Sequence, residues 1–141
     1  TTPTPSIPEA QRWLRQARSD LQAAHNDTRH DCPNWVLFKL HQTLEKALVA
    51  AVLCHGEALE APVGLLEQAQ WLEVVEPKLK GLVEEVEWLH GCGVDAVATQ
   101  YPSYHPFPIT PSEAFHDVDE KEVLKRAQGV LGRLQDHVDG M

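Results

Sequence analysis

The stretch that decides the fold is Trp35–Val52, WVLFKLHQTLEKALVAAV. At about 100° per residue, Lys39, Gln42 and Lys46 fall on nearly one line with Trp35, and apolar side chains occupy most of the remaining circumference. A helix that is apolar on most sides is usually buried at the centre of a bundle. A lysine on such a helix either extends its amine to solvent or meets an anion. The sequence therefore predicts a central helix with one thin polar stripe.

The segments around this stretch also have helical spacing. Helices are predicted from Ser6 to about Asn26, over 64–75, from Pro77 to about 91, and over the last twenty or so residues. Residues 57–63 and QYPSYHPFPITP (100–111) are predicted loops, and no stretch shows a strand-like alternation or an internal repeat. We expect an all-α, up-and-down helical bundle of about five helices, with a proline- and aromatic-rich loop before the last one. Residues 1–6 are interpreted as a linker and 7–141 as a single domain.

Several polar residues stand where helix caps belong. Ser6 with Glu9 and Thr110 with Glu113 each fit a capping box, and residues 117–120 fit a third. Asp31 is expected to cap the central helix, with a proline in its first turn. These signals set the expected helix starts.

The bulk composition excludes several function classes. A chain of 141 residues with 43% hydrophobic residues supports one domain with a real core. A net charge of −9 disfavours binding to nucleic acid or to an anionic membrane surface. Residues 1–46 hold six Lys/Arg against five Asp/Glu, whereas the rest of the chain holds six against sixteen, so an anion site belongs in the first third. No apolar run reaches the roughly 18 residues of a membrane span.

Three cysteines, Cys32, Cys54 and Cys92, cannot all pair within one chain. Their spacing matches no disulfide framework, so we interpret them as free thiols in a reducing compartment. The TTPTPS opening is interpreted as a linker at a boundary within a longer protein. Together these features predict a cytoplasmic domain of a larger chain.

Three motifs carry a resemblance to a known family. WLRQARSDLQAAHND (13–27) resembles a W-L-x-x-A-x-x-D-L-x-x-A opening, and LEKALVAA (44–51) resembles an E-K-A-L-K-A signature with Val49 in place of its second lysine. QYPS (100–103) resembles an R-Y-P-D loop, but Gln100 and Ser103 replace its arginine and aspartate and so remove any salt bridge there. In this order, over residues 8–138, the motifs resemble the HEPN domain (higher eukaryotes and prokaryotes nucleotide-binding). The PFP sequence that follows, at 106–108, is similar to the sacsin-like branch of that family.

The resemblance implies both a fold and a set of functions. HEPN domains are helical bundles that commonly dimerise, and they bind nucleotides, cleave RNA in some branches and act as scaffolds in others. The sacsin-like branch belongs to a very large co-chaperone and is associated with dimerisation and nucleotide binding. The chain is therefore expected to be a dimerising HEPN module of a larger sacsin-like co-chaperone. Its expected ligand is an anion, most plausibly a nucleoside triphosphate (ATP or GTP), with no cofactor required and a homodimer as the expected assembly.

Basic residues on the first two helices are the candidates for binding a phosphate. The first helix carries Arg15, Arg18 and His25 along one flank of its apolar face, and the central helix carries Lys39 and Lys46. If the two sets meet, they form a positive cleft, because guanidinium groups bind phosphate oxygens in a bidentate manner. Two alternatives stay open. The arginine flank can be solvated or paired with acidic helices, and Lys46 can pair with an acid such as Asp20 while Lys39 extends at a dimer edge.

Neither catalysis nor metal binding is predicted. Ribonuclease HEPN domains use an arginine and a histidine on a later helix, whereas the sole Arg-x6-His pair of this chain, Arg18 to His25, lies on the first helix. Arg133 and His137 are spaced too closely for that motif. The His-Asp-Cys and His-Gly-Cys clusters at 30–32 and 90–92 lack a second pair of ligands at zinc-site spacing. We therefore predict no catalytic residue, no enzyme activity and no metal.

The residues predicted for a subunit interface are Trp35 and Gln42 on the central helix and Tyr101 and Phe107 in the loop. Loop aromatics of this kind cover the open end of a bundle, become buried at a subunit contact, or stack on a base. We favour packing of these aromatic side chains against protein over their stacking on a base. Two further functions stay open beside nucleotide binding: a non-enzymatic dimerisation or protein-interaction scaffold without nucleotide, and, less favoured, a residual ribonuclease.

Overall fold

The computed structural model describes residues 6–56 and 64–141, and within those ranges it contains helices and no strand. Its α-helices are α1 (Ile7–Asp27), α2 (Pro33–Leu53), α3 (Leu65–Val75), α4 (Leu82–Gly91), α5 (Pro111–Ala114) and α6 (Glu120–Asp139). Five of these are long and α5 is a single turn, so the predicted all-α bundle is confirmed. Most of the predicted linker and the whole predicted loop at 57–63 lie outside the described residues.

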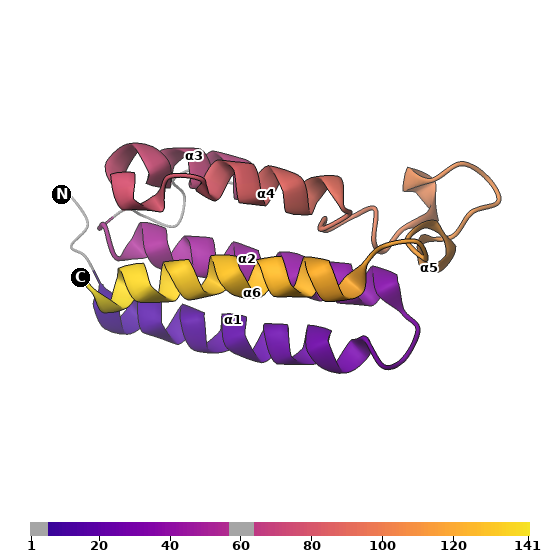
Figure 1. The fold of residues 1–141 in the computed structure, drawn as a ribbon, viewed down its shortest axis with the longest axis horizontal. Helices are drawn as coiled ribbons and strands as arrows, with labels where there is room; N and C mark the ends of the chain where they lie inside the picture. Colours follow the sequence, from indigo (N-terminus) through magenta and orange to yellow (C-terminus); the bar gives the residue numbers. More distant parts are fainter. Residues whose placement is uncertain (1–5, 57–63) are drawn as a thin grey trace.

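The helix α2 occupies the centre of the bundle. It packs against α1, α3, α5 and α6, and it lies with α1 and α6 along the long axis of the molecule (Figure 1). Its apolar positions Leu37, Leu40, Leu44 and Leu48 are completely buried. The shorter helices α3 and α4 pack on each other, α3 against α2 and α4 against α6. The prediction of a central α2 is therefore confirmed.

The two predicted caps at the N-terminal half of the chain do not form. Ser6 precedes α1, but its side chain makes no capping hydrogen bond. Glu9 instead accepts hydrogen bonds from Arg12 Nη2 at 2.7 Å and from Trp13 Nε1 at 3.1 Å. Asp31 has a left-handed backbone (φ 52°) and lies one residue too early, so Cys32 takes the N-cap position of α2. Local side-chain partners on α1 and the tight α1–α2 turn thus override the capping signals.

The fourth helix begins later than predicted. Pro77–Leu79 forms only a 3-10 turn, Gly81 adopts a left-handed conformation (φ 94°), and α4 starts at Leu82. The start is fixed from another helix: Glu73 Oε1 of α3 accepts the backbone N–H of Gly81 at 2.6 Å and of Val83 at 3.3 Å. Glu73 is distant in sequence from the start of α4. The prediction relied on Pro77 alone and therefore placed the start of this helix too early.

The caps before α5 and α6 agree better with the sequence. Thr110 and Glu113 form the predicted capping box at α5. At α6 the side chain of Asp119 accepts the N–H of Glu122 at 3.1 Å. The cap of α6 is therefore Asp119, and the box predicted for residues 117–120 does not form.

Candidate functional site

The two lysines of the central helix are engaged by aspartates of α1. Lys39 Nζ lies 2.5 Å from Asp27 Oδ2, and Lys46 Nζ lies 2.8 Å from Asp20 Oδ2. Lys46 also donates a hydrogen bond to Gln42 Oε1 at 3.2 Å. All four charged side chains are partly shielded by the packing of α1 on α2. The polar stripe of α2 is thus neutralised within the chain: Lys46 pairs with Asp20, as the alternative anticipated, whereas Lys39 pairs with Asp27 and does not extend unpaired at a dimer edge.

The basic flank of α1 faces a different neighbour. Arg18 and His25 line a groove of about 460 Å³ between α1 and α6, and Arg18 Nη1 donates a hydrogen bond to Gln135 Oε1 of α6. The other lining residues are Leu21, Gln22, Gln128, Leu131, Gly132 and Gln135. No carboxylate is among the lining residues, in a chain with a net charge of −9. This α1–α6 groove is thus lined by basic and neutral side chains; a smaller hollow of about 220 Å³ at Arg12 and Lys46 also has no carboxylate in its lining.

The five predicted cations therefore do not converge on one cleft. Arg18 and His25 lie in the α1–α6 groove, while Lys39 and Lys46 lie between α1 and α2. Arg15 is exposed on α1, one turn before Arg18. A wheel diagram shows the two flanks of a helix but not which neighbour each flank meets. For this reason the prediction placed in one cleft two sets of basic residues that lie in different parts of the bundle.

A second hollow, next to α2, α3 and α4, has the opposite character. It measures about 390 Å³, and three of its lining residues are acidic: Glu67, Glu87 and Asp95. His41 and His90 also line it. Burial lowers the pKa of His41, against the opposing influence of Glu45 and Asp95. A hollow with three carboxylates and a neutral imidazole is poorly suited to phosphate.

The proline-rich loop before α5 presents its aromatic side chains to solvent. Tyr101, Tyr104 and Phe107 are 51%, 58% and 97% exposed, and Ile109 is 38% exposed. Only His105 turns inward between 101 and 109, where its Nε2 lies 2.6 Å from Ala98 O and its ring meets the edge of Phe115. We call Tyr101, Tyr104, Phe107 and Ile109 the aromatic loop. Because these side chains do not cover the end of the bundle, the prediction that they pack there within their own chain is wrong.

The interface candidates on α2 differ from one another. Trp35, at the start of α2, is 43% exposed and packs edge-on against Phe38, with 5.9 Å between ring centres. Asn34 beside it donates to Thr99 O at 3.1 Å, which ties this end of α2 to the segment leading into the aromatic loop. Gln42, in contrast, is half-buried beside Lys46. Trp35 and the aromatic loop thus lie toward the same end of the bundle.

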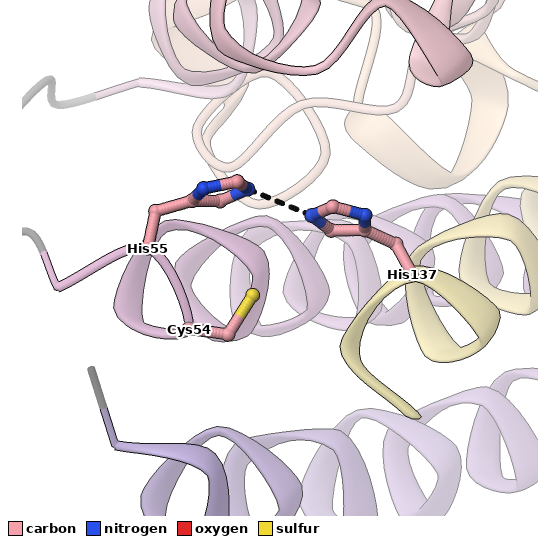
Figure 2. A group of neighbouring side chains, drawn as sticks. All are labelled: Cys54, His55 and His137. Atoms are coloured by element: carbon pink, nitrogen blue, oxygen red, sulfur yellow. Dashed lines mark hydrogen bonds between the residues drawn. The ribbon is translucent and has the colours of Figure 1, made fainter. Parts of the chain in front are cut away.

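At the opposite end of the bundle, three side chains gather that the sequence analysis did not connect. Figure 2 shows His55, just after α2, facing His137 of α6, with the sulfur of Cys54 on the same side. The Nε2 atoms of the two histidines are 2.7 Å apart, and one donor atom from each of the three residues lies within 4.8 Å of the others. Cys54 is completely buried, and burial raises the pKa of its thiol to about 11.

The sequence held only a weak signal for this group. Cys54 and His55 are adjacent, but His137 lies 82 residues beyond His55, outside the reach of any spacing rule. Contact requires that α2 and α6 end at the same end of the bundle. The clusters weighed from sequence, at 30–32 and 90–92, do not form a three-ligand group among the described residues.

Comparisons with known proteins agree with the fold. A model of the HEPN domain family matches residues 10–137. Human sacsin is 34% identical over 127 residues, which cover 90% of this chain and 3% of the length of sacsin. Among the helices of the described ranges, none is long and apolar enough to cross a membrane. On the family match, the shared helical architecture and the identity to sacsin, the chain belongs to the HEPN domain family.

Proposed function

We propose that this HEPN domain is a dimerising module of a larger sacsin-like co-chaperone and that it binds a nucleoside triphosphate, ATP or GTP, in the α1–α6 groove. The observation that supports the ligand is the lining of the groove, which carries Arg18 and His25 and no carboxylate. The chemistry required of the domain is binding, without a catalytic step.

The groove offers each kind of contact that a nucleotide needs. The Arg18 guanidinium supplies a planar fork of donors for phosphate oxygens, and Arg15 can add charge one turn away along α1. The side-chain amides of Gln22 and Gln128 can donate to and accept from the base or sugar. Leu21 and Leu131 give an apolar floor, and apolar walls with a few polar groups are typical of ligand sites.

Arg18 already donates to Gln135, so a phosphate has to replace that hydrogen bond. A phosphate carries negative charge and can accept two parallel N–H bonds from the guanidinium, whereas the Gln135 amide oxygen is neutral. The exchange therefore favours the anion. Lys39 and Lys46 take no part in this proposal, because each has an aspartate partner on α1.

The ligand proposal is tested by thermal unfolding with ATP, GTP, their diphosphates and inorganic phosphate at two salt concentrations. A ligand at about 100 times its Kd stabilises by about 2.7 kcal/mol, which raises Tm by several degrees. Arg18→Glu should abolish the rise. Arg12→Glu is the matched control, because Arg12 lies on the same helix but pairs with Glu9 away from the groove. An equal rise in both variants would exclude the α1–α6 groove.

One observation favours a second function, a scaffold that dimerises and binds no nucleotide. Two of the five candidate cations are already paired with aspartates, as expected of charges that serve the fold. In this case the domain is a dimer whose Tm does not respond to any nucleotide. The same titration separates the two functions.

Dimerisation is proposed to use the aromatic loop. Phe107 is 97% exposed, and exposed aromatic side chains are enriched at protein interfaces. Phe107→Asp should convert the dimer into a monomer in sedimentation velocity experiments. Val74→Asp is the control, since Val74 of α3 is 82% exposed and lies outside the loop. A dimer that survives Phe107→Asp and Trp35→Ala would move the interface elsewhere.

A further inference from the structure

The ends of α2 and α6 meet in a group of side chains that the proposed nucleotide and dimer sites do not use. Cys54 and His55 directly follow the last residue of α2, and His137 lies in the last turn of α6. Their donor atoms all lie within 4.8 Å of one another, and the Nε2 atoms of the two imidazoles face each other in Figure 2. Three ligand side chains from two helices thus share one small volume.

We propose that Cys54, His55 and His137 form a three-ligand site for Zn²⁺ or a similar thiophilic divalent ion. A thiolate with two imidazoles is a ligand set that zinc prefers. The set contains no carboxylate, which excludes the all-oxygen coordination that Mg²⁺ and Ca²⁺ require. The bound ion would fasten the end of α2 to the end of α6.

The three donor atoms, which lie within 4.8 Å of one another, have to adjust to hold an ion. Tetrahedral zinc with Zn–N bonds of about 2.0–2.1 Å holds two nitrogens ~3.4 Å apart. The two Nε2 atoms are now 2.7 Å apart, so the rings have to separate slightly. Both rings belong to partly exposed side chains at helix ends, and the His55 ring also packs edge-on against Trp71, with 5.8 Å between ring centres. His137 also lines a cavity of about 340 Å³, to which Cys54 and His55 do not contribute.

The electrostatic environment favours a cation at this point. The C-terminal ends of α2 and α6 each carry the partial negative charge of the helix dipole, and they converge on the group. Glu76 and Asp136 line the cavity beside His137. Two cations, Lys78 and Arg133, line it as well, but Arg133 donates to the carbonyl oxygens of Lys78 and Lys80. The two acidic and two basic side chains around the cavity therefore balance one another, and the helix ends add partial negative charge.

Binding has a defined proton balance. Without metal, one imidazole donates its Nε2–H to the Nε2 lone pair of the other, which is the 2.7 Å contact. The ion takes both Nε2 lone pairs and the thiolate. The shared proton then moves to Nδ1 of the ring that carried it, and the thiol proton goes to solvent. One proton leaves the protein for each ion bound.

Cobalt(II) absorption tests the proposal on the chain without a polyhistidine tag. One equivalent of Co²⁺ should give visible d–d bands and a near-ultraviolet band from thiolate to cobalt, and Zn²⁺ should bleach both. Cys54→Ala should remove the thiolate band. His137→Gln should weaken binding by more than the roughly 10–100-fold that loss of an indirect partner costs.

The chain provides a matched control in another neighbouring histidine and cysteine, His90 and Cys92. The double variant His90→Gln/Cys92→Ser should leave the spectrum and the affinity unchanged. If circular dichroism shows that Cys54→Ala does not fold, His55→Gln and His137→Gln carry the test. Absence of a thiolate band in the wild type, survival of the band in Cys54→Ala, or its loss in the His90/Cys92 variant would each overturn the proposal.

Discussion

Asp20 of α1 and Lys46 of α2 form an ion pair, with 2.8 Å between Oδ2 and Nζ, and the pair is one rung of a ladder. The other rung joins Asp27 and Lys39. Seven residues separate the rungs on each helix, from 20 to 27 and from 39 to 46, so the side chains of each helix are nearly eclipsed. Two antiparallel helices with this spacing can form both ion pairs at once in one register only. The ladder therefore fixes how α1 slides along α2.

The first prediction concerns this ladder. Asp20→Ala leaves Lys46 partly buried without its carboxylate, and because each side chain of the pair is only about 20% exposed, we expect a loss of about 1–3 kcal/mol in the free energy of unfolding. Urea denaturation measures this value. Arg12→Ala removes the more exposed pair with Glu9 and keeps the hydrogen bond from Trp13, so it should cost less than Asp20→Ala. Equal costs would mean that the ladder adds no stability beyond that of a surface pair.

The second prediction uses two glycines of α6. Gly129 and Gly132 are both exposed, and an added Cβ at either would meet no neighbour within 4 Å. Alanine at either position should therefore stabilise the domain by about 0.8–1 kcal/mol through helix propensity. Thermal or urea unfolding of the two variants checks this.

The same glycines give a third prediction, about the ligand. Gly132 lines the α1–α6 groove, whereas Gly129 lines the other side of α6. Gly132→Glu should abolish the Tm rise with a triphosphate, because it adds bulk and negative charge inside the groove. Gly129→Glu adds the same charge one turn away and should preserve the rise. Loss of the response in both would mean that charge on α6, and not occupation of the groove, is responsible.

The fourth prediction is a pH dependence centred on His41. Burial lowers the pKa of this imidazole, Glu45 and Asp95 act in the opposite direction, and His90 and Lys46 add to the lowering. Since the folded-state pKa lies below the unfolded value of about 6.5, the full stability is present above pH 6.5. It is lost as the pH falls through the folded-state pKa.

Urea denaturation between pH 7.5 and pH 5 measures this loss. His41→Gln should flatten the part of the profile below pH 6.5, because the neutral amide cannot be protonated there. His30→Gln, at an exposed position of the α1–α2 turn, should leave the profile unchanged. A profile that keeps its slope in His41→Gln would assign the acid sensitivity to another group.

The fifth prediction tests how α4 is started. Glu73 accepts two backbone N–H groups at the start of α4, and their loss should cost about 1–2 kcal/mol in Glu73→Ala. Hydrogen exchange at Val83 should accelerate in the same variant. Glu87→Ala, at an exposed position on α4, serves as the control and should change neither quantity appreciably.

The sequence predicted those parts of the fold that are local. The apolar circumference of α2 predicted a central helix, and Thr110 with Glu113 predicted the cap of α5, because both signals lie within a few residues. The predictions of helix caps and starts that failed involve either competing hydrogen-bond partners or residues distant in sequence. Glu9 had two better partners on its own helix, and Glu73 caps a helix that begins nine residues later.

The candidate site was predicted only in its parts. The basic residues of α1 and α2 were identified, but the sequence does not say which flank of α1 faces α2 and which faces α6. Asp20 and Asp27 belong to the flank toward α2, and Arg18 and His25 to the flank toward α6. The meeting of His55 with His137 likewise depends on where two helices end. Such facts follow from the bundle as a whole and from no single stretch.

The start of α1 and the end of α6 lie at one end of the bundle, and the aromatic loop lies toward the other (Figure 1). A helix of 21 residues such as α1 is about 30 Å long at ~1.5 Å per residue. Two copies joined through their aromatic loops would place the starts of α1 and the ends of α6 at the two outer ends of the pair, ~60 Å apart. If the proposed function holds, such a pair would keep the adjoining parts of two sacsin-like chains at that separation.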